Sequence, residues 1–321
     1  MSETREETAE VRVPLGRFLV SFVLVPGAII LVCLATVVGL RWMMFSETGP
    51  DQLVETIERR EGNARWRAAV QLAGLLADPN HAAVRRDRQL AGRLTEILRR
   101  ELQAAGARNE DAALQIYLCR ALGEFESDVS LPVLVQASSS RHDGAVRRSA
   151  IEAIALLAGT LGSDRVGPEP GLAESLLAAS RDGDWQIRLS AAYALGVLGG
   201  DEAEERLTAM LLDERTLVRY NAATGLARRG NAAAIDVLLE MLAPDQQTVI
   251  GSSPGGTLAS VQQNLIHVNA LEAARQLLAV NPEVSSEQFR AAIERLSETT
   301  ESQAVRKKVE ELLKLVPADP S

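Results

Sequence analysis

The chain has 321 residues and a net charge of −9, and aromatic residues make up only 3% of it. Because an acidic chain repels phosphate backbones, we do not expect nucleic acid to be a general partner. Alanine and leucine are abundant, and small side chains let paired helices approach closely. We therefore expect an all-α protein.

The first predicted element is an apolar segment from Phe18 to Leu40 that contains no charged side chain. About 20 apolar residues suffice to cross a hydrocarbon core of about 30 Å. Arg17 and Arg41 bracket the segment, and Trp42 lies at an edge, where indole rings favour the headgroup layer. A signal peptide has an apolar region of only about 7 to 15 residues. We therefore expect an uncleaved transmembrane helix over residues 18–42 rather than a buried core helix or a cleaved signal.

The charges around this span indicate its orientation. Arg5, Arg12 and Arg17 precede it, whereas Arg41 alone follows it closely. Since cytoplasmic flanks carry the excess of basic residues, this favours a cytoplasmic tail over residues 1–17 and an extracytoplasmic body. Lysines are few and arginines many, as is typical of GC-rich bacterial genomes. We expect a single-pass protein of a bacterial inner membrane.

Residues 43–62 are expected to form a juxtamembrane linker and a first helix, residues 63–315 a repeat array, and residues 316–321 a C-terminal tail. The array repeats the phrase Val-Arg-x-x-Ala-(Ala)-x-Ala-Leu-Gly, which is clearest over residues 187–196. Such periodic self-similarity indicates a solenoid. The seven copies begin at unequal intervals, at Trp66-Arg67, Leu114-Gln115, Val146-Arg147, Ile187-Arg188, Val218-Arg219, Ile266-His267 and Val305-Arg306.

Each phrase predicts one amphipathic helix, because its small and apolar residues recur four and seven positions after the first. A second apolar stripe usually follows, as at Ala203, Leu207, Met210 and Leu211, so the helices should stack in pairs. Asn and Asp side chains accept the free N–H groups of a first turn. We expect such helix caps three residues before the Val position, at Asn63, Asp111, Asp143 and Asp184, and glycine ends at Gly123, Gly199 and Gly230.

These residues resemble HEAT repeats, in particular the HEAT-like class first described in phycobilisome lyases. The resemblance covers residues 60–315 and rests on the motif Asp-x-x-(Val/Ile)-Arg-x-x-Ala-(Ala)-x-Ala. It implies an α-solenoid, a right-handed superhelix of antiparallel helix pairs, with protein recognition as the usual role. In such repeats the arginine often meets an acidic side chain of a neighbouring unit, which implies a structural ladder of Arg67, Arg147, Arg188, Arg219 and Arg306.

Several residues depart from the motif. Gln115 and His267 replace the arginine, and Trp66 replaces the valine, so these units are candidates for caps or specialised repeats. Residues 160–171 and 244–258 are insertions rich in turn-forming residues, which are expected to be loops that either stay plain or bind a partner.

One basic stretch breaks the acidic background. An apolar stripe interleaves it, which predicts a long repeat helix with a basic outer face. This face is either simply solvated or in contact with anionic lipid headgroups. The basic residues are Arg85, Arg86, Arg88, Arg93, Arg99 and Arg100.

The sequence shows no residue pattern for catalysis, a cofactor or a metal. Gly251 and Gly256 have the spacing of a phosphate loop, but Thr257 stands where its lysine would be. His81, His142 and His267 have no ligand partner at metal spacing, and Cys33 and Cys119 are expected to be packing residues. We therefore expect neither an enzyme nor a small-molecule substrate.

The leading hypothesis is a membrane-anchored, non-catalytic scaffold that binds a protein partner. The alternative is a bilin lyase or a lyase-like chaperone, which the resemblance to the repeat class suggests. Attachment of bilin to a co-expressed phycobiliprotein would favour the alternative. A third hypothesis, a HEAT-like DNA glycosylase, needs a cationic groove that the net acidity disfavours.

Overall fold

The computed structural model describes residues 34, 36, 49–59, 62–104, 109–243 and 257–314. The described residues contain helices and turns but no β-strand. The chain divides into two units, Met1–Gly49 and Pro50–Ser321. The expected membrane segment from Phe18 to Leu40 lies outside the described residues apart from Leu34 and Thr36. Among the residues that are described, no helix combines the length and the apolar character needed to cross a bilayer.

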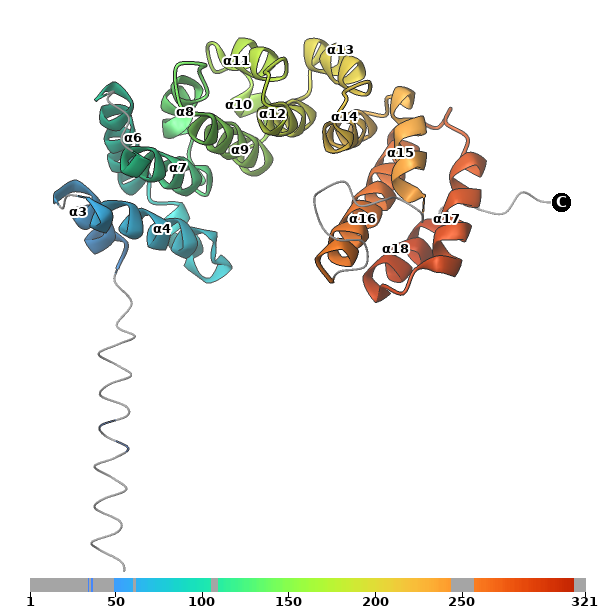
Figure 1. Ribbon diagram of the computed structural model, residues 1–321, viewed down its shortest axis with the longest axis horizontal. Helices are drawn as coiled ribbons and strands as arrows, with labels where there is room; N and C mark the ends of the chain where they lie inside the picture. The colour runs from blue at the N-terminus through green and yellow to red at the C-terminus, as the bar shows by residue number, and fades with distance from the viewer. Residues whose placement is uncertain are drawn as a thin grey trace, which may run out of the picture. The chain divides into compact units, whose positions relative to one another are not determined.

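The phrase-bearing helices of Pro50–Ser321 pack against one another in sequence and form the layer that we call the inner layer (Figure 1). Within this unit the array curves, and the inner layer lies on the concave side. The inner helices are α4 (Asn63–Ala77), α7 (Asn109–Gly123), α9 (Gly144–Leu161), α12 (Trp185–Leu198), α14 (Thr216–Arg228), α16 (Thr257–Val280) and α18 (Gln303–Leu313).

Among the outer helices, most inner helices pack chiefly against the one that precedes them, so we describe a repeat as an outer helix followed by a phrase helix. The outer helices are α3 (Pro50–Arg59), α6 (Arg88–Gln103), α8 (Leu131–Ala137), α11 (Leu172–Ala179), α13 (Asp201–Met210), α15 (Ile235–Leu242) and α17 (Glu287–Thr299). α12 also packs against α13, the outer helix that follows it, which is the pairing that the stripe from Ala203 to Leu211 predicted.

The array begins at Pro50 and not at Asn63, because α3 packs against α4 and buries Leu53, Val54 and Ile57. Short helices complete the connections between pairs. They are η2 (Pro79–His81), α5 (Ala82–Arg85), η3 (Asp128–Ser130), α10 (Ser163–Val166) and η4 (Ala232–Ala234).

The core follows the predicted stripe. In α9, Val146, Ala150, Ala153 and Ile154 are all buried, which confirms the spacing of four and seven. Small residues allow the closest contacts between inner helices. A Cβ atom placed on Gly225 would lie 2.8 Å from the Cα atom of Gly196, so α12 and α14 touch through their backbones.

Glycines end the inner helices as expected at two positions. Gly199 follows α12 with a φ of 72°, and Gly230 follows α14 with a φ of 76°, a conformation that side chains disfavour. Gly123 is the last residue of α7, where an added Cβ atom would lie 2.8 Å from the Cα of Ala153. Its role is therefore close packing against α9.

The insertion at residues 160–171 is ordered and packed, and is not a plain loop. It contains the end of α9 and the short helix α10, whose Val166 is fully buried. Arg165 of α10 donates a hydrogen bond to Asp128 at 2.9 Å, which ties the insertion to the preceding repeat. Of the second insertion, residues 244–256 lie outside the described residues.

Candidate functional site

The phrase arginines form ion pairs between successive repeats. Arg147 Nη2 lies 2.6 Å from the Asp182 carboxylate, and Arg188 Nε lies 2.8 Å from that of Asp213. Arg219 Nη2 lies 2.8 Å from Glu240. Each acid stands in the outer helix of the next repeat or just after it. The arginine therefore joins two repeats, as the resemblance implied.

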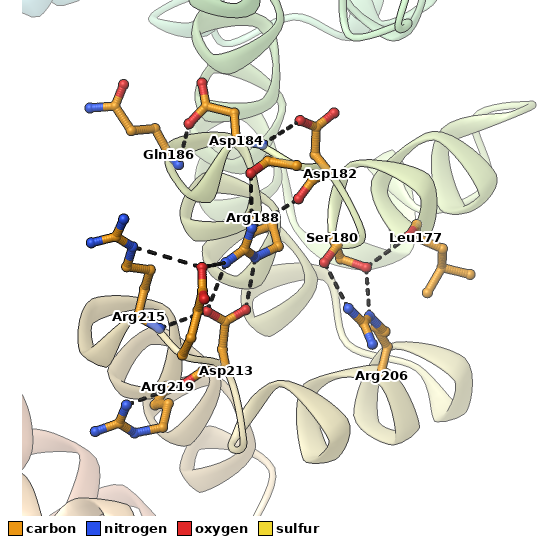
Figure 2. A network of polar contacts seen from close by, with 12 residues as sticks. Leu177, Ser180, Asp182, Asp184, Gln186, Arg188, Arg206, Asp213, Arg215 and Arg219 are labelled. Atoms are coloured by element: carbon orange, nitrogen blue, oxygen red, sulfur yellow. Dashed lines mark hydrogen bonds and ion pairs between the residues drawn. The ribbon is translucent and has the colours of Figure 1, made fainter.

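The same arginines also bond backward to the backbone. Arg188 donates to the carbonyl of Asp182, and Arg219 donates to that of Asp213 (Figure 2). These carbonyls belong to the connection that follows the outer helix of the same repeat, after Ala179 and Met210. Asp182 and Asp213 thus accept from one arginine through the carboxylate and from the next through the carbonyl.

The residues that replace the arginine keep the carbonyl bond. Gln115 Nε2 donates to the carbonyl of Glu101 at 3.0 Å, and His267 Nε2 lies 3.4 Å from the carbonyl of Ala243. Arg306 Nη2 likewise donates to the carbonyl of Thr300. Gln115 is neutral and cannot form an ion pair, and neither His267 nor Arg306 has a carboxylate within 4.0 Å among the described residues. The ladder is therefore a continuous backbone contact with an ionic contact added at some repeats.

The prediction for the first repeat was wrong by two residues. Arg67 does not join the ladder, and Arg65 takes its place, with Nε 2.7 Å from the carbonyl of Ile57 and Nη2 2.6 Å from Glu101. Arg65 is followed three residues later by Ala68, as Arg147 is by Ala150. The ladder arginine is therefore identified by the alanine three residues after it. The identity of the residue before the arginine does not identify it.

Two of the four expected caps lie at helix N-termini. Asp143 accepts a hydrogen bond from the Ala145 N–H and Asp184 accepts one from the Gln186 N–H, both at 2.8 Å. The other two expected caps are wrong. Asn63 is the first residue of α4, whose N-cap is Gly62, and its side chain accepts from Trp66 instead. Asp111 lies inside α7, because that helix begins earlier, at Asn109.

The basic stretch is neutralised by carboxylates of neighbouring elements. Arg93 pairs with Asp51 and Glu58 of α3, and Arg86 pairs with Glu126. Further pairs join Arg85 to Glu126, Arg88 to Asp128 and Arg99 to Glu96. Most of the positive charge on this face is thus balanced within the protein, which weakens the case for contact with lipid headgroups.

The inner layer contains a pocket of about 500 Å³ between α12, α14 and α16. This volume lies within the range of small-ligand and side-chain pockets. Apolar side chains, among them Leu189, Leu217 and Ile266, line it together with the ring of Tyr193. Four amides complete the lining, from Asn221, Gln262, Asn269 and Gln276.

Tyr193 and Leu265 are exposed to solvent at this pocket, 39% and 59% respectively. An exposed apolar patch beside amide donors and acceptors is typical of surfaces that bind peptides. Sequence reasoning missed this site because it examined only the core and cap positions of the phrase, whereas Tyr193 and Leu265 are exposed.

The acidic group of the pocket, Glu272, is held by cations. Arg275 Nη2 lies 2.5 Å and Lys308 Nζ 3.3 Å from its carboxylate. Hydrogen bonds from Arg275 and then Lys308 lower the pKa of Glu272 to about 2, against the opposing effect of partial burial. Glu272 is therefore ionised at neutral pH and its charge is already balanced.

A second group of inner-layer side chains pairs arginines with aromatic rings. The rings of Trp66 in α4 and Tyr117 in α7 stack, with centroids 6.5 Å apart. The Arg67 guanidinium lies 5.7 Å from the Trp66 ring centre, and that of Arg120 lies 5.3 Å from the ring centre of Tyr117. Arg228 lies 5.8 Å from the ring centre of Tyr193, at the pocket. These distances are typical of cation–π contacts.

The remaining reactive groups are buried. Burial lowers the pKa of His267, although its bond to the Ala243 carbonyl opposes this, so its ring is neutral at pH 7. Burial raises the pKa of the Cys119 thiol to about 12. Within the described ranges, no group of three or more His, Cys, Asp or Glu side chains could hold a metal ion. Cys33 lies outside those ranges.

Comparison with known proteins agrees with this architecture. A family described as HEAT repeats matches residues 173–252. This range covers the helices from α11 to α15, which include the ladder ion pairs of Arg188 and Arg219. No curated protein matches the chain.

Three solved structures are similar to the chain at low identity. YibA of Escherichia coli is 16% identical, with 82% of this chain and 92% of that chain covered and a TM-score of 0.46. An engineered protein is 17% identical, with 83% and 96% covered and a TM-score of 0.38. Human deoxyhypusine hydroxylase in complex with glycerol is 19% identical, with 86% and 98% covered and a TM-score of 0.34.

Proposed function

We propose that the protein is a membrane-tethered, non-catalytic scaffold that binds a protein partner on its inner layer. The observation that carries this proposal is the pocket between α12, α14 and α16. It combines an apolar lining and an exposed tyrosine with the amides of Gln262 and Asn269, which can pair with a peptide backbone. The ladder supports the same function, because it fixes the spacing of the repeats that present this surface.

The membrane tether is the segment from Phe18 to Leu40, which precedes the array in the sequence. Its length and lack of charge support a single span, and the arginines before it support an extracytoplasmic array at a bacterial inner membrane. A scaffold held in this way would bind its partner close to the membrane surface.

Photocrosslinking tests the binding surface. We expect that p-benzoylphenylalanine at Tyr193 of the full-length protein, expressed in its native host, crosslinks one discrete partner protein. The matched control places the same group at Glu174, which is exposed on the outer helix α11. Equal yields of the same adduct from both positions would contradict binding on the inner layer.

Membrane extraction tests the tether. We expect alkaline carbonate to leave the full-length protein in the membrane fraction, and we expect the double substitution Ile30→Arg and Leu31→Arg to release it. Release of the unaltered protein would exclude a transmembrane span.

Cysteine labelling tests the orientation. Leu212 is 88% exposed in the connection between α13 and α14, so Leu212→Cys in a Cys33→Ser background offers one accessible thiol. Cys119 does not compete because it is buried. An impermeant maleimide should label this variant in spheroplasts, and labelling only after lysis would place the array in the cytoplasm.

A further inference from the structure

Three arginines of the inner layer differ from the other arginines of the array. Arg67, Arg120 and Arg228 are exposed, and each guanidinium lies over an aromatic ring. Within the part of the chain that the structure describes, none of the three has a carboxylate within 4.0 Å. By contrast, Arg65, Arg147, Arg188 and Arg219, at the junctions between repeats, are all ion-paired.

An aromatic ring beneath a guanidinium restricts its orientation without occupying its N–H groups. The five N–H donors lie in the plane of the guanidinium and match both oxygens of a carboxylate. Stacking on Trp66, Tyr117 and Tyr193 therefore leaves Arg67, Arg120 and Arg228 able to bind acidic groups. These arginines lie in a chain of net charge −9. Unneutralised positive charge on one face of an acidic protein indicates a partner that carries negative charge.

The anion is better explained as separate carboxylates than as a continuous phosphate chain. The chain carries a net charge of −9, which repels the unbroken phosphate charge of a nucleic acid. Its aromatic-backed arginines stand in two separate groups, Arg67 with Arg120 and Arg228 alone. A peptide can place a few carboxylates at these two groups and neutral residues elsewhere.

The spacing of the inner helices sets the spacing of the acidic groups. Arg120 lies in α7 and Arg228 in α14, and α9 and α12 lie between these helices (Figure 1). Packed helices are about 8–10 Å apart, so three steps cover about 27 Å. An extended peptide rises about 3.3 Å per residue and therefore spans this distance in about eight residues.

We propose that the inner layer binds an extended acidic segment of its partner. One group of carboxylates contacts Arg67 and Arg120, and another contacts Arg228 about eight residues away. An apolar side chain next to the second group enters the pocket beside Tyr193. The proposal rests on the proposed function, since it names the chemistry of the partner that the scaffold binds.

Fluorescence anisotropy with defined peptides tests the proposal. The probe is a fluorescein-labelled 16-residue peptide with Glu-Glu pairs at positions 3–4 and 12–13, Leu at position 14 and Gly-Ser elsewhere. The protein is the full chain in nanodiscs of neutral lipid. We expect this peptide to bind at least tenfold more tightly at 50 mM salt than its Glu→Gln version. The difference should shrink as salt is added, because exposed ion pairs are screened.

Protein variants locate the binding. We expect Arg120→Gln and Arg228→Gln each to weaken binding of the acidic peptide about fivefold or more. The matched control is Arg59→Gln in the outer helix α3, whose exposed arginine pairs with Glu55, and it should change binding less than twofold. When the two Glu pairs of the peptide are adjacent, they cannot reach both groups of arginines. One of the two variants, Arg120→Gln or Arg228→Gln, should then no longer weaken binding. Thermal unfolding checks that each variant is folded.

Three outcomes would overturn the proposal. They are equal binding of the Glu and Gln peptides, equal effects of all three arginine variants, and preferential binding of a 16-nucleotide oligothymidine that Arg120→Gln abolishes. If Tyr193 crosslinks a partner but Arg120→Gln and Arg228→Gln leave the crosslink unchanged, the scaffold function stands and the acidic segment is wrong. If neither crosslinking nor peptide binding occurs, both proposals fail.

Discussion

The guanidinium of Arg188 donates two hydrogen bonds to the carboxylate of Asp213, at 2.8 and 3.0 Å, and both side chains are nearly buried. The same arginine also donates to the carbonyl of Asp182, which follows the preceding outer helix. One side chain thereby connects three parts of the array. Charge-assisted bonds of this kind are stronger than neutral ones.

Asp213→Asn should destabilise the array. The substitution leaves a partly buried arginine without its counter-charge, which costs about 1–3 kcal/mol in the free energy of unfolding. Urea unfolding followed by circular dichroism measures this loss. The control is Glu214→Gln, because Glu214 is 76% exposed and lies 3.4 Å from the same arginine, and it should cost less than about 0.5 kcal/mol. Equal losses from the two variants would show that burial of the pair does not matter.

Gly225→Ala should be strongly destabilising. The added methyl group would lie 2.8 Å from the Cα of Gly196 and 3.2 Å from the side chain of Leu207, so α12 and α14 must separate. Overpacking of this kind costs about 1–3 kcal/mol. The control is Gly92→Ala in α6, where nothing lies within 4 Å of the added methyl. This change should stabilise by up to about 1 kcal/mol, because alanine favours a helix over glycine. In thermal unfolding, Tm should fall for Gly225→Ala and rise for Gly92→Ala.

Stability should decrease as the pH falls through about 6.5, the ordinary pKa of histidine. Burial lowers the pKa of His267, so the unfolded chain binds a proton at a higher pH than the folded protein does. The contribution of His267 to the free energy of unfolding is therefore complete above pH 6.5. It is lost as the pH falls from 6.5 toward the lower pKa that His267 has in the folded protein. Burial followed by the charges of Arg141 and Arg147 lowers the pKa of His142 in the same direction.

His267→Gln separates the two histidines. Glutamine occupies the equivalent position in the second repeat and donates there to a backbone carbonyl. We expect this variant to keep the carbonyl bond and to show a smaller loss of stability between pH 7 and 5.5, measured by urea unfolding. The control, His142→Gln, removes only the contribution of His142. An unchanged pH slope in His267→Gln would mean that His267 is protonated equally in the folded and unfolded states.

Cys119 should be unreactive in the folded protein. Its side chain is fully buried in α7, and burial raises its pKa to about 12, so neither access nor thiolate is available at pH 8. In a Cys33→Ser background, Ellman's reagent should react with less than one thiol per chain until urea unfolds the array. Rapid stoichiometric reaction without denaturant would show that α7 opens readily from its neighbours.

The sequence predicted the helical repeat well because the core positions recur with the same small or apolar residues. Val146, Ala150 and Ile154 are examples, and they are buried as expected. It predicted the first repeat poorly, because Trp66-Arg67 imitates the Val-Arg pair while the true register begins with Arg65. Only the distance to Ala68 distinguishes the two alignments.

The neutralised basic stretch could not be predicted because its partners lie far away in the sequence. Arg93 pairs with Asp51 and Glu58, more than one helix earlier. The inner pocket could not be predicted either, since Tyr193 occupies a position that no other repeat fills with an aromatic residue. Repeats reveal what is common to their copies, and binding surfaces depend on what differs.

The ladder also explains where its arginines are absent. Asp182 and Asp213 supply the carboxylates at the position that follows the outer helix. In the repeat after Gln115 this position is Ser138, and in the repeat after His267 it is Thr300. Neither residue has a carboxylate. The side chain at the arginine position of each repeat thus matches the residue that it meets in the next repeat. The repeats cannot be exchanged or deleted freely, because a wrong order would leave a half-buried charge without a counter-charge. The junction between α7 and α8 is one place where a shorter array could be cut without breaking a ladder ion pair.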